Sequence, residues 1–81
     1  MMSPEEVQQK IAQAIPDSTV EVQDMTGTRD HFQVLVISPQ FTGKTMVEQH
    51  QMVYRALGEW MKEAIHALAL KTYTPEQWKN A

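Results

Sequence analysis

The sequence contains no cysteine, and this absence limits the chemistry that the chain can perform alone. It excludes a disulfide framework and a thiol nucleophile. It also excludes a zinc ribbon or an iron–sulfur site that is held by the chain's own thiolates. A small domain without disulfides fits a reducing compartment, so we expect a cytoplasmic protein.

Long apolar runs and an excess of basic charge are also missing. No stretch approaches the roughly 20 apolar residues that a membrane-spanning helix needs, so we expect no membrane association. The first residues include Glu5 and Glu6 and no apolar block, which is not typical of a signal peptide. The net charge is −3, which argues against a strongly electrostatic nucleic-acid binder.

What remains is the composition of an ordinary globular domain. Hydrophobic residues make up 42% and charged residues 21% of the 81 positions. This length predicts a single domain over residues 1–81. A domain of this size has room for one layer of strands and a few helices, and little room for a deep cleft.

Three helices are predicted from caps and apolar spacing. The first starts at the capping sequence Ser3-Pro4-Glu5-Glu6 and stops at Pro16. The longest covers residues 45–63, and a short terminal helix is capped by Thr74 and anchored by Trp78. The apolar stripe predicted for the longest helix comprises Met46, Val47, His50, Val53, Tyr54, Leu57, Trp60 and Met61.

Three strands are predicted at residues 19–24, 32–38 and 65–74, because these segments alternate or are rich in β-branched residues. The element order is therefore α-β-β-α-β-α, with a polar connection at 25–30. Alternation directs Phe32, Val34 and Val36 toward the helices and leaves Leu35 and Ile37 on the opposite face. If the helices cover one side, an apolar area stays open, which is typical of a partner surface.

The three histidines are the residues with the clearest chemical potential. His50 lies on the predicted helical stripe, and we interpret it as structural. His31 and His66 start the second and third strands, and each alone is more often structural or solvated than a ligand. Two imidazoles cannot complete a tetrahedral metal site, so any metal bound by His31 and His66 would need ligands from another molecule.

Other catalytic or binding constellations are weak. The segment "FTGK" looks like the end of a phosphate loop, but Ser38 stands where that motif needs glycine. The acidic pair Glu59 and Glu63 is spaced like a solvated helix face. No nucleophile has a recognisable base, and we therefore expect no enzyme activity.

Several segments together resemble the BolA-like family. They are "FTGK", "QHQMVY", "IHALALKTYTP" and the closing "EQW", and the resemblance covers about residues 3–78. It implies an α+β fold, a single αββαβα domain akin to the type II KH domain, with a three-stranded sheet and helices on one face.

The resemblance also implies a partner and a cofactor. Members of this family pair with monothiol glutaredoxins that carry a Cys-Gly-Phe-Ser site and share a [2Fe-2S] cluster with glutaredoxin and glutathione thiolates. The family's third-strand ligand falls on His66. The ligand before the second strand, a cysteine or histidine in the family, falls on His31, which makes this chain similar to the histidine-loop type. The isolated chain is then expected to bind no cluster.

Two functions follow as hypotheses. The first is a non-enzymatic adaptor that forms a heterodimer with a monothiol glutaredoxin in iron–sulfur cluster trafficking or iron and redox regulation, with a homodimer as a further candidate. The alternative is a KH-like, nucleic-acid-binding transcription regulator that uses Lys44, Arg55 and Lys71. Many family members have Arg-His-Arg where this chain has Gln49-His50-Gln51, which weakens the alternative.

Overall fold

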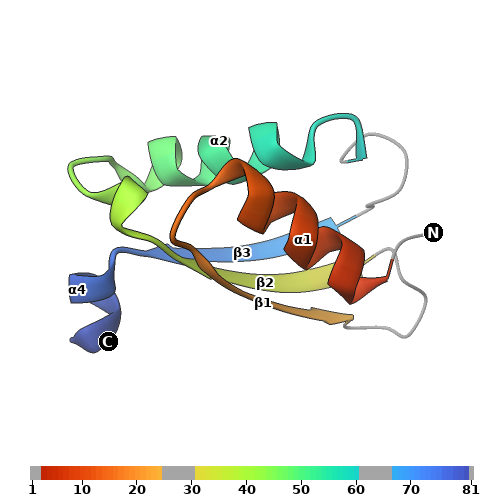
Figure 1. The fold of residues 1–81 in the computed structure, drawn as a ribbon, viewed down its shortest axis with the longest axis horizontal. Helices are drawn as coiled ribbons and strands as arrows, with labels where there is room; N and C mark the ends of the chain where they lie inside the picture. Colours follow the sequence, from red (N-terminus) through yellow and green to blue (C-terminus); the bar gives the residue numbers. More distant parts are fainter. Residues whose placement is uncertain (1–2, 25–30, 61–66, 81) are drawn as a thin grey trace.

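The computed structural model describes residues 3–24, 31–60 and 67–80, and it contains the predicted order of elements (Figure 1). Its helices and strands are α1 (Pro4–Ala14), β1 (Thr19–Asp24), β2 (His31–Ile37), the 3-10 turn η1 (Pro39–Phe41), α2 (Met46–Leu57), β3 (Ala67–Tyr73) and α4 (Pro75–Lys79). The predicted connection at 25–30 and the first two residues of the predicted third strand lie outside the described ranges. Among the described helices, none combines the length and apolar character needed to cross a membrane.

The three strands form one mixed sheet in the order β1-β2-β3. β1 and β2 pair antiparallel, whereas β2 and β3 pair in parallel. Because parallel neighbours need a long crossover connection, the chain must leave the sheet between β2 and β3, and α2 lies on that connection. The resulting three-stranded α+β architecture is the one predicted.

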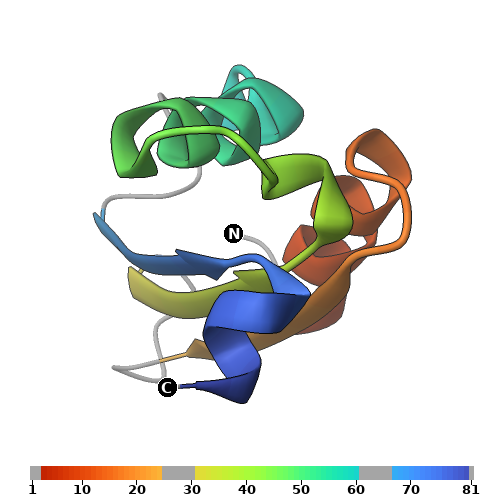
Figure 2. The same ribbon diagram turned by 90° about the vertical axis from the view of Figure 1, so that its left-hand side faces the viewer.

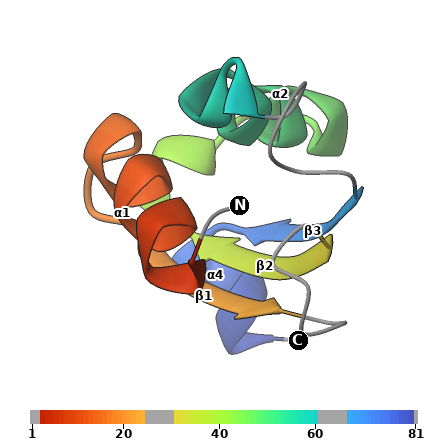
Figure 3. The same ribbon diagram turned by 90° about the vertical axis from the view of Figure 1, so that its right-hand side faces the viewer.

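The two long helices, α1 and α2, cover one face of the sheet (Figures 1 and 3). Phe32, Val34 and Val36 are fully buried between the sheet and these helices, as the alternation predicts, while Leu35 and Ile37 are half-buried on the other face. This two-layer packing places one hydrophobic core between helices and sheet. Its buried members are Val7, Ile11, Ile15, Val20, Phe32, Val34, Val36, Phe41, Val53 and Leu57.

Side-chain caps fix where the helices begin. The Ser3 hydroxyl accepts from the Glu6 backbone N–H, and the Glu6 carboxylate accepts from the Ser3 backbone N–H, as predicted. Thr74 caps α4 in the same reciprocal way with Gln77. Each such box satisfies backbone donors that the first helical turn leaves without intrahelical partners.

The predicted extent and stripe of the long central helix are partly wrong. α2 ends at Leu57 because Gly58 caps it with φ of 57°, a left-handed conformation that glycine adopts without strain. Met46 and Val47 are 69% and 66% exposed, and Tyr54 is also exposed. Val53 and Leu57 are buried as predicted, and the third buried position of α2 is Gln49, which the predicted stripe left out.

The misassigned stripe has a physical reason, because one of the buried positions is a glutamine. The Gln49 amide nitrogen donates to the backbone carbonyls of Lys44 and Phe41 at 3.1 and 3.4 Å. Its amide oxygen accepts from the Thr72 hydroxyl at 2.8 Å, and Thr72 is itself buried in β3. Gln49 therefore joins α2, the turn before it and β3, and its polarity is satisfied rather than exposed.

A single residue, Thr74, separates β3 from the short α4, which lies on the side of the sheet away from α2 (Figures 1 and 2). The Trp78 ring packs on Tyr73, with ring centroids 5.4 Å apart, although Trp78 remains 47% exposed. Trp78 thus packs back toward the sheet as predicted. It does so on the face that α1 and α2 leave open, so α4 departs from the expectation that every helix lies on one face.

We predict that Gln49→Ala destabilises the domain by about 2–3 kcal/mol, because the Thr72 hydroxyl and two backbone carbonyls lose their partner in a buried site. The free energy of unfolding is measured by urea denaturation. Gln51→Ala is the matched control, since Gln51 is an exposed glutamine on the same helix and its truncation should change stability by less than about 0.5 kcal/mol. Equal effects of the two substitutions would contradict the structural role of Gln49.

Candidate functional site

The starts of β2 and β3 lie side by side at one end of the sheet, the right-hand end in Figure 1. His31, the first residue of β2, pairs in register with Ala67, the first residue of β3. Neighbouring strands are about 4.8 Å apart, so the backbones of these two residues are separated by roughly that distance. His66 directly precedes Ala67 in the sequence and lies outside the described residues.

The third histidine lies on α2, in its second turn. His50 is half-buried, and its ring meets the Tyr54 ring edge-on with a centroid separation of 6.4 Å and an interplanar angle of 78°. The His50 imidazole therefore contacts a side chain of its own helix. The structural interpretation of His50 stays a prediction.

The described residues hold no complete metal site of their own. No group of three or more histidine, cysteine, aspartate or glutamate side chains within 3–24, 31–60 and 67–80 is arranged to hold a metal ion. A metal bound at the strand starts would therefore draw on residues outside these ranges or on another molecule.

The three basic residues proposed for nucleic-acid contact do not form one surface. Lys71 projects from β3 between Leu70, which packs on the core, and Thr72, which is buried under α2. Strand alternation therefore directs Lys71 to the face opposite α2. Lys44 precedes α2 and Arg55 lies in its last turn, a separation of about 15 Å along a helix. The structure thus separates Lys71 from Lys44 and Arg55, and a role for any of the three in nucleic-acid contact stays a prediction.

The sequence matches the profile of BolA-like proteins over residues 5–77. The chain belongs to the BolA-like family. It is 35% identical to the "DNA-binding transcriptional regulator BolA" of Escherichia coli, over 99% of this chain and 83% of that protein. It is 43% identical to "Protein BOLA2" of Arabidopsis thaliana, over 98% of this chain and 86% of that protein.

Solved structures of BolA proteins have the same fold. The BolA protein homologue from Coxiella burnetii superposes with a TM-score of 0.83 at 36% sequence identity, covering 98% of this chain and 99% of that chain. The BolA1 protein of Mus musculus superposes with a TM-score of 0.83 at 30% identity, covering 95% and 68%. The αββαβα arrangement is therefore that of known BolA proteins.

The BolA-like domain also has a feature that sequence reasoning identified only in outline. The open face of the sheet forms a shallow hollow of about 570 Å³. Polar side chains of all three strands and the Trp78 ring line it, among them Glu21, Gln33, Lys71, Tyr73 and Trp78. Alternation predicted an open apolar area here, but, apart from Lys71, the polar strand residues that share the face received no role.

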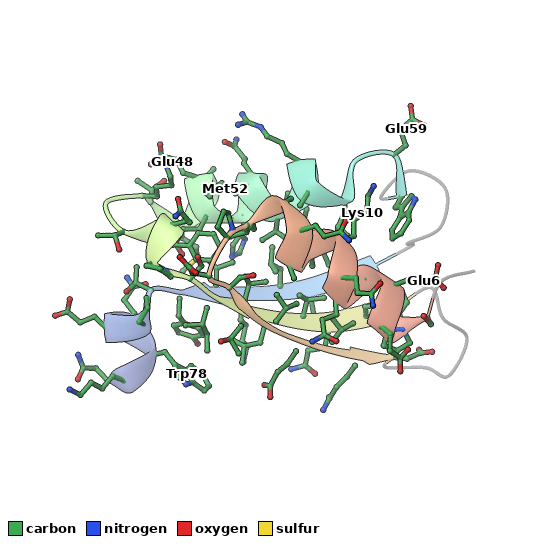
Figure 4. All side chains as sticks on the ribbon, in the orientation of Figure 1. Glu6, Lys10, Glu48, Met52, Glu59 and Trp78 are labelled. Carbon is green, nitrogen blue, oxygen red and sulfur yellow. The ribbon has the colours of Figure 1, made fainter. Side chains whose placement is uncertain are left out.

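A carboxylate occupies the N-terminus of α2, directly after the "FTGK" segment of this BolA-like chain. The Thr45 backbone N–H donates to Glu48 Oε1 at 2.9 Å, and the Glu48 backbone N–H donates to Thr45 Oγ1 at 3.2 Å. Figure 4 shows Glu48 at this end of α2. The hydrogen bond from the Thr45 backbone, followed by that with its side chain, lowers the pKa of Glu48. A negative group already sits where a phosphate would bind, which agrees with rejecting the nucleotide-loop interpretation.

We predict that Glu48 makes stability fall in acid. Because the folded-state pKa of Glu48 is depressed, its contribution is present above the unfolded value of about 4.3 and is lost as the pH falls through the folded value. Glu48→Gln keeps an acceptor for the Thr45 N–H but cannot titrate. Urea unfolding between about pH 5 and pH 3 should show a shallower loss of stability for Glu48→Gln than for the parent. Parallel pH profiles would show that Glu48 contributes no proton linkage.

Proposed function

We propose that this BolA-like protein is a non-enzymatic adaptor that pairs with a monothiol glutaredoxin of the Cys-Gly-Phe-Ser type. His66 and His31 would ligate a [2Fe-2S] cluster whose remaining ligands are glutaredoxin and glutathione thiolates. The parallel pairing of β2 and β3 is the observation that carries this proposal, because it puts His31 in register with the residue that follows His66.

The donor set of the chain fits one part of such a cluster. The sequence offers imidazoles and no thiolate, whereas a [2Fe-2S] cluster accepts two histidines on one of its irons in place of two cysteines. His31 and Ala67 start neighbouring strands about 4.8 Å apart, and His66 directly precedes Ala67 in the sequence, which supports the proposal that both histidines serve a single iron. When bound, the cluster supplies the electron-transfer chemistry, and imidazole ligation raises its reduction potential relative to all-thiolate ligation.

The two histidines are expected to contribute unequally. The family resemblance assigns a histidine to the third-strand motif, where His66 falls, but either cysteine or histidine to the position before the second strand, where His31 falls. We propose that the third-strand position anchors the cluster and that the position before the second strand tunes it. His66 is therefore the principal ligand and His31 the modulating one.

We predict that His66→Ala abolishes the mixed cluster and that His31→Ala leaves a more labile cluster with an altered spectrum. Each variant is mixed anaerobically with cluster-loaded glutaredoxin and followed by visible circular dichroism over time. His50→Ala is the matched control, because it removes the imidazole of α2 and should leave the cluster spectrum of a folded protein unchanged. A parent-like spectrum and lifetime for His66→Ala would overturn the ligand assignment.

The alternative function, binding of nucleic acid by a transcription regulator, is favoured by one observation, the name of the Escherichia coli relative. Because the basic residues lie on two sides of the molecule, the nucleic-acid hypothesis has two candidate binding surfaces. Lys44 and Arg55 belong to the α2 side, whereas Lys71 belongs to the open face of the sheet. Binding of DNA through the α2 side would involve the first two residues and leave Lys71 free.

We predict that, if the α2 side binds DNA, Lys44→Gln and Arg55→Gln each reduce the slope of log affinity against log salt by about 1. Lys71→Gln should leave that slope unchanged, because its side chain lies on the other face of the sheet. Fluorescence anisotropy with a labelled duplex at several salt concentrations measures the slopes. A parent affinity too weak to depend on salt would exclude this alternative.

A further inference from the structure

The open face of the sheet carries a row of three residues with an unusual charge order. Glu21 on β1 pairs in register with Leu35 on β2, and Leu35 pairs with Lys71 on β3. An acidic, an apolar and a basic side chain thus lie side by side across the sheet. All three have the strand parity that faces away from α1 and α2, since the residues flanking Leu35 in β2 are fully buried.

Within the described part of the chain, neither charge of this row has a partner. Glu21 and Lys71 are exposed, and neither has a hydrogen-bonding or charged partner among the residues that the structure describes. Two strand spacings separate them, about 10 Å, which is more than the screening length of about 8 Å at physiological ionic strength. Their mutual attraction is therefore small, and both remain available to another molecule.

The rows on either side of it are uncharged. Ile37 is flanked by Thr19 and Tyr73, and Gln33 is flanked by Gln23 and Ala69. On this face of the central strand, Leu35 and Ile37 are apolar, half-buried and open to contact, whereas Gln33 is polar. The Trp78 ring lies beside this face at its Tyr73 end (Figure 4).

We propose that the open face is the interface for a second copy of this chain, related by a two-fold axis that runs along β2 between the two sheets. Rotation about this axis keeps the position along the strand and exchanges the two sides of the sheet. Glu21 of each copy then faces Lys71 of the other, while Leu35 faces Leu35 and Ile37 faces Ile37. The row is self-complementary in this arrangement, as an isologous interface requires.

The dimensions of packed sheets permit these contacts over the part of the open face that α4 and Trp78 leave uncovered. Sheets that pack face to face lie about 10 Å apart with their strands nearly aligned. An extended glutamate and an extended lysine together span that gap, and two opposed leucines fill it. Three strands of about seven residues offer roughly 330 Å² per copy in projection, or about 660 Å² for the pair, which is below the roughly 1,000 Å² of a stable specific interface and fits only a transient contact. The dimer is therefore weak, reversible and dependent on concentration.

Other occupants match this face less well. A nucleic acid would be attracted by Lys71 but repelled by Glu21, which is also exposed. A partner of uniform charge meets the same conflict at one end of the row. A second copy alone satisfies both charges with the pattern already present in the chain. This inference does not depend on the proposed cluster function.

Charge reversal tests the two-fold arrangement. Glu21→Lys puts lysine opposite lysine at two symmetry-related places, and Lys71→Glu puts glutamate opposite glutamate. Each single variant should dimerise about tenfold more weakly than the parent at low salt, measured by sedimentation equilibrium over a range of concentrations. The double variant Glu21→Lys/Lys71→Glu restores both pairs and should return to within about threefold of the parent.

Mixing the two single variants gives the sharpest readout. A copy with two lysines matches a copy with two glutamates at both ends of the row, so the mixture should associate although neither variant self-associates. Arg55→Glu is the control, because it reverses an exposed charge on α2 and should leave dimerisation at the parental level. Thermal melting followed by circular dichroism verifies that each variant is folded.

Three results would overturn the proposal. They are a parent that stays monomeric at every concentration, single reversals that dimerise as well as the parent, and folded single variants that fail to associate when mixed. If the parent is monomeric and Lys71→Glu instead abolishes the glutaredoxin complex, the open face belongs to glutaredoxin and not to a second copy. Loss of the cluster from His66→Ala leaves the dimer proposal untouched, so the two proposals fail separately.

Discussion

β2 and β3 run in parallel, and most of the architecture depends on this pairing. A parallel neighbour cannot be reached by a tight turn, so the chain must cross over one face of the sheet before β3 begins. That crossover contains α2, which covers the same face as α1 and buries the core. Because the pairing is parallel, both strands begin at the same end of the sheet, where His31 lies in register with Ala67. One constraint thus produces both the covered face and the end of the sheet on which the proposed cluster site depends.

A buried polar contact holds the crossover helix to the sheet. The Gln49 amide oxygen accepts a hydrogen bond from the Thr72 hydroxyl of β3. Its amide nitrogen donates to two backbone carbonyls of the turn that precedes α2. Apolar contacts such as those of Val53 and Leu57 stabilise this packing without fixing one rotation of the helix, since neighbouring stripes also contain apolar residues. The hydrogen-bonding geometry of Gln49 is more restrictive. It explains why Met46 and Val47 remain exposed although their hydrophobicity favours burial.

The strands and helix starts could be predicted from the sequence because they depend on local signals. The capping residues Ser3 and Thr74 act within their own first turns, and the alternation of β2 requires only that one face be buried. The end and rotation of α2 could not be predicted in the same way. Gly58 is tolerated inside some helices, and burial of Gln49 depends on Thr72, which lies 23 positions away. The sequence alone contains no sign of that contact.

The same distinction between local signals and long-range contacts applies to the candidate site. The family resemblance pointed to His31 and His66, and the sheet register brings the backbone of His31 beside the start of β3. The basic residues Lys44, Arg55 and Lys71 looked equivalent in sequence because charge carries no information about which face of the sheet a residue occupies. The buried neighbours of Lys71 separate it from the other two. The charge order of Glu21, Leu35 and Lys71 could be recognised only after the register was known, since these residues are far apart in the chain.

The two proposals also bear on one another through the direction of the strands. A two-fold axis along β2 preserves the position along the strand, so a second copy would place its own β2 and β3 starts at the same end of the dimer. A glutaredoxin bound at that end therefore lies near the dimer interface, whereas α4 and Trp78 lie at the far end of β3. If both proposals hold and the two partners overlap, binding of glutaredoxin weakens self-association, and self-association weakens glutaredoxin binding by the same factor, because linked equilibria are reciprocal. The small area of the sheet interface fits this role, because a partner that also gains metal–ligand bonds can displace the second copy from a weak dimer.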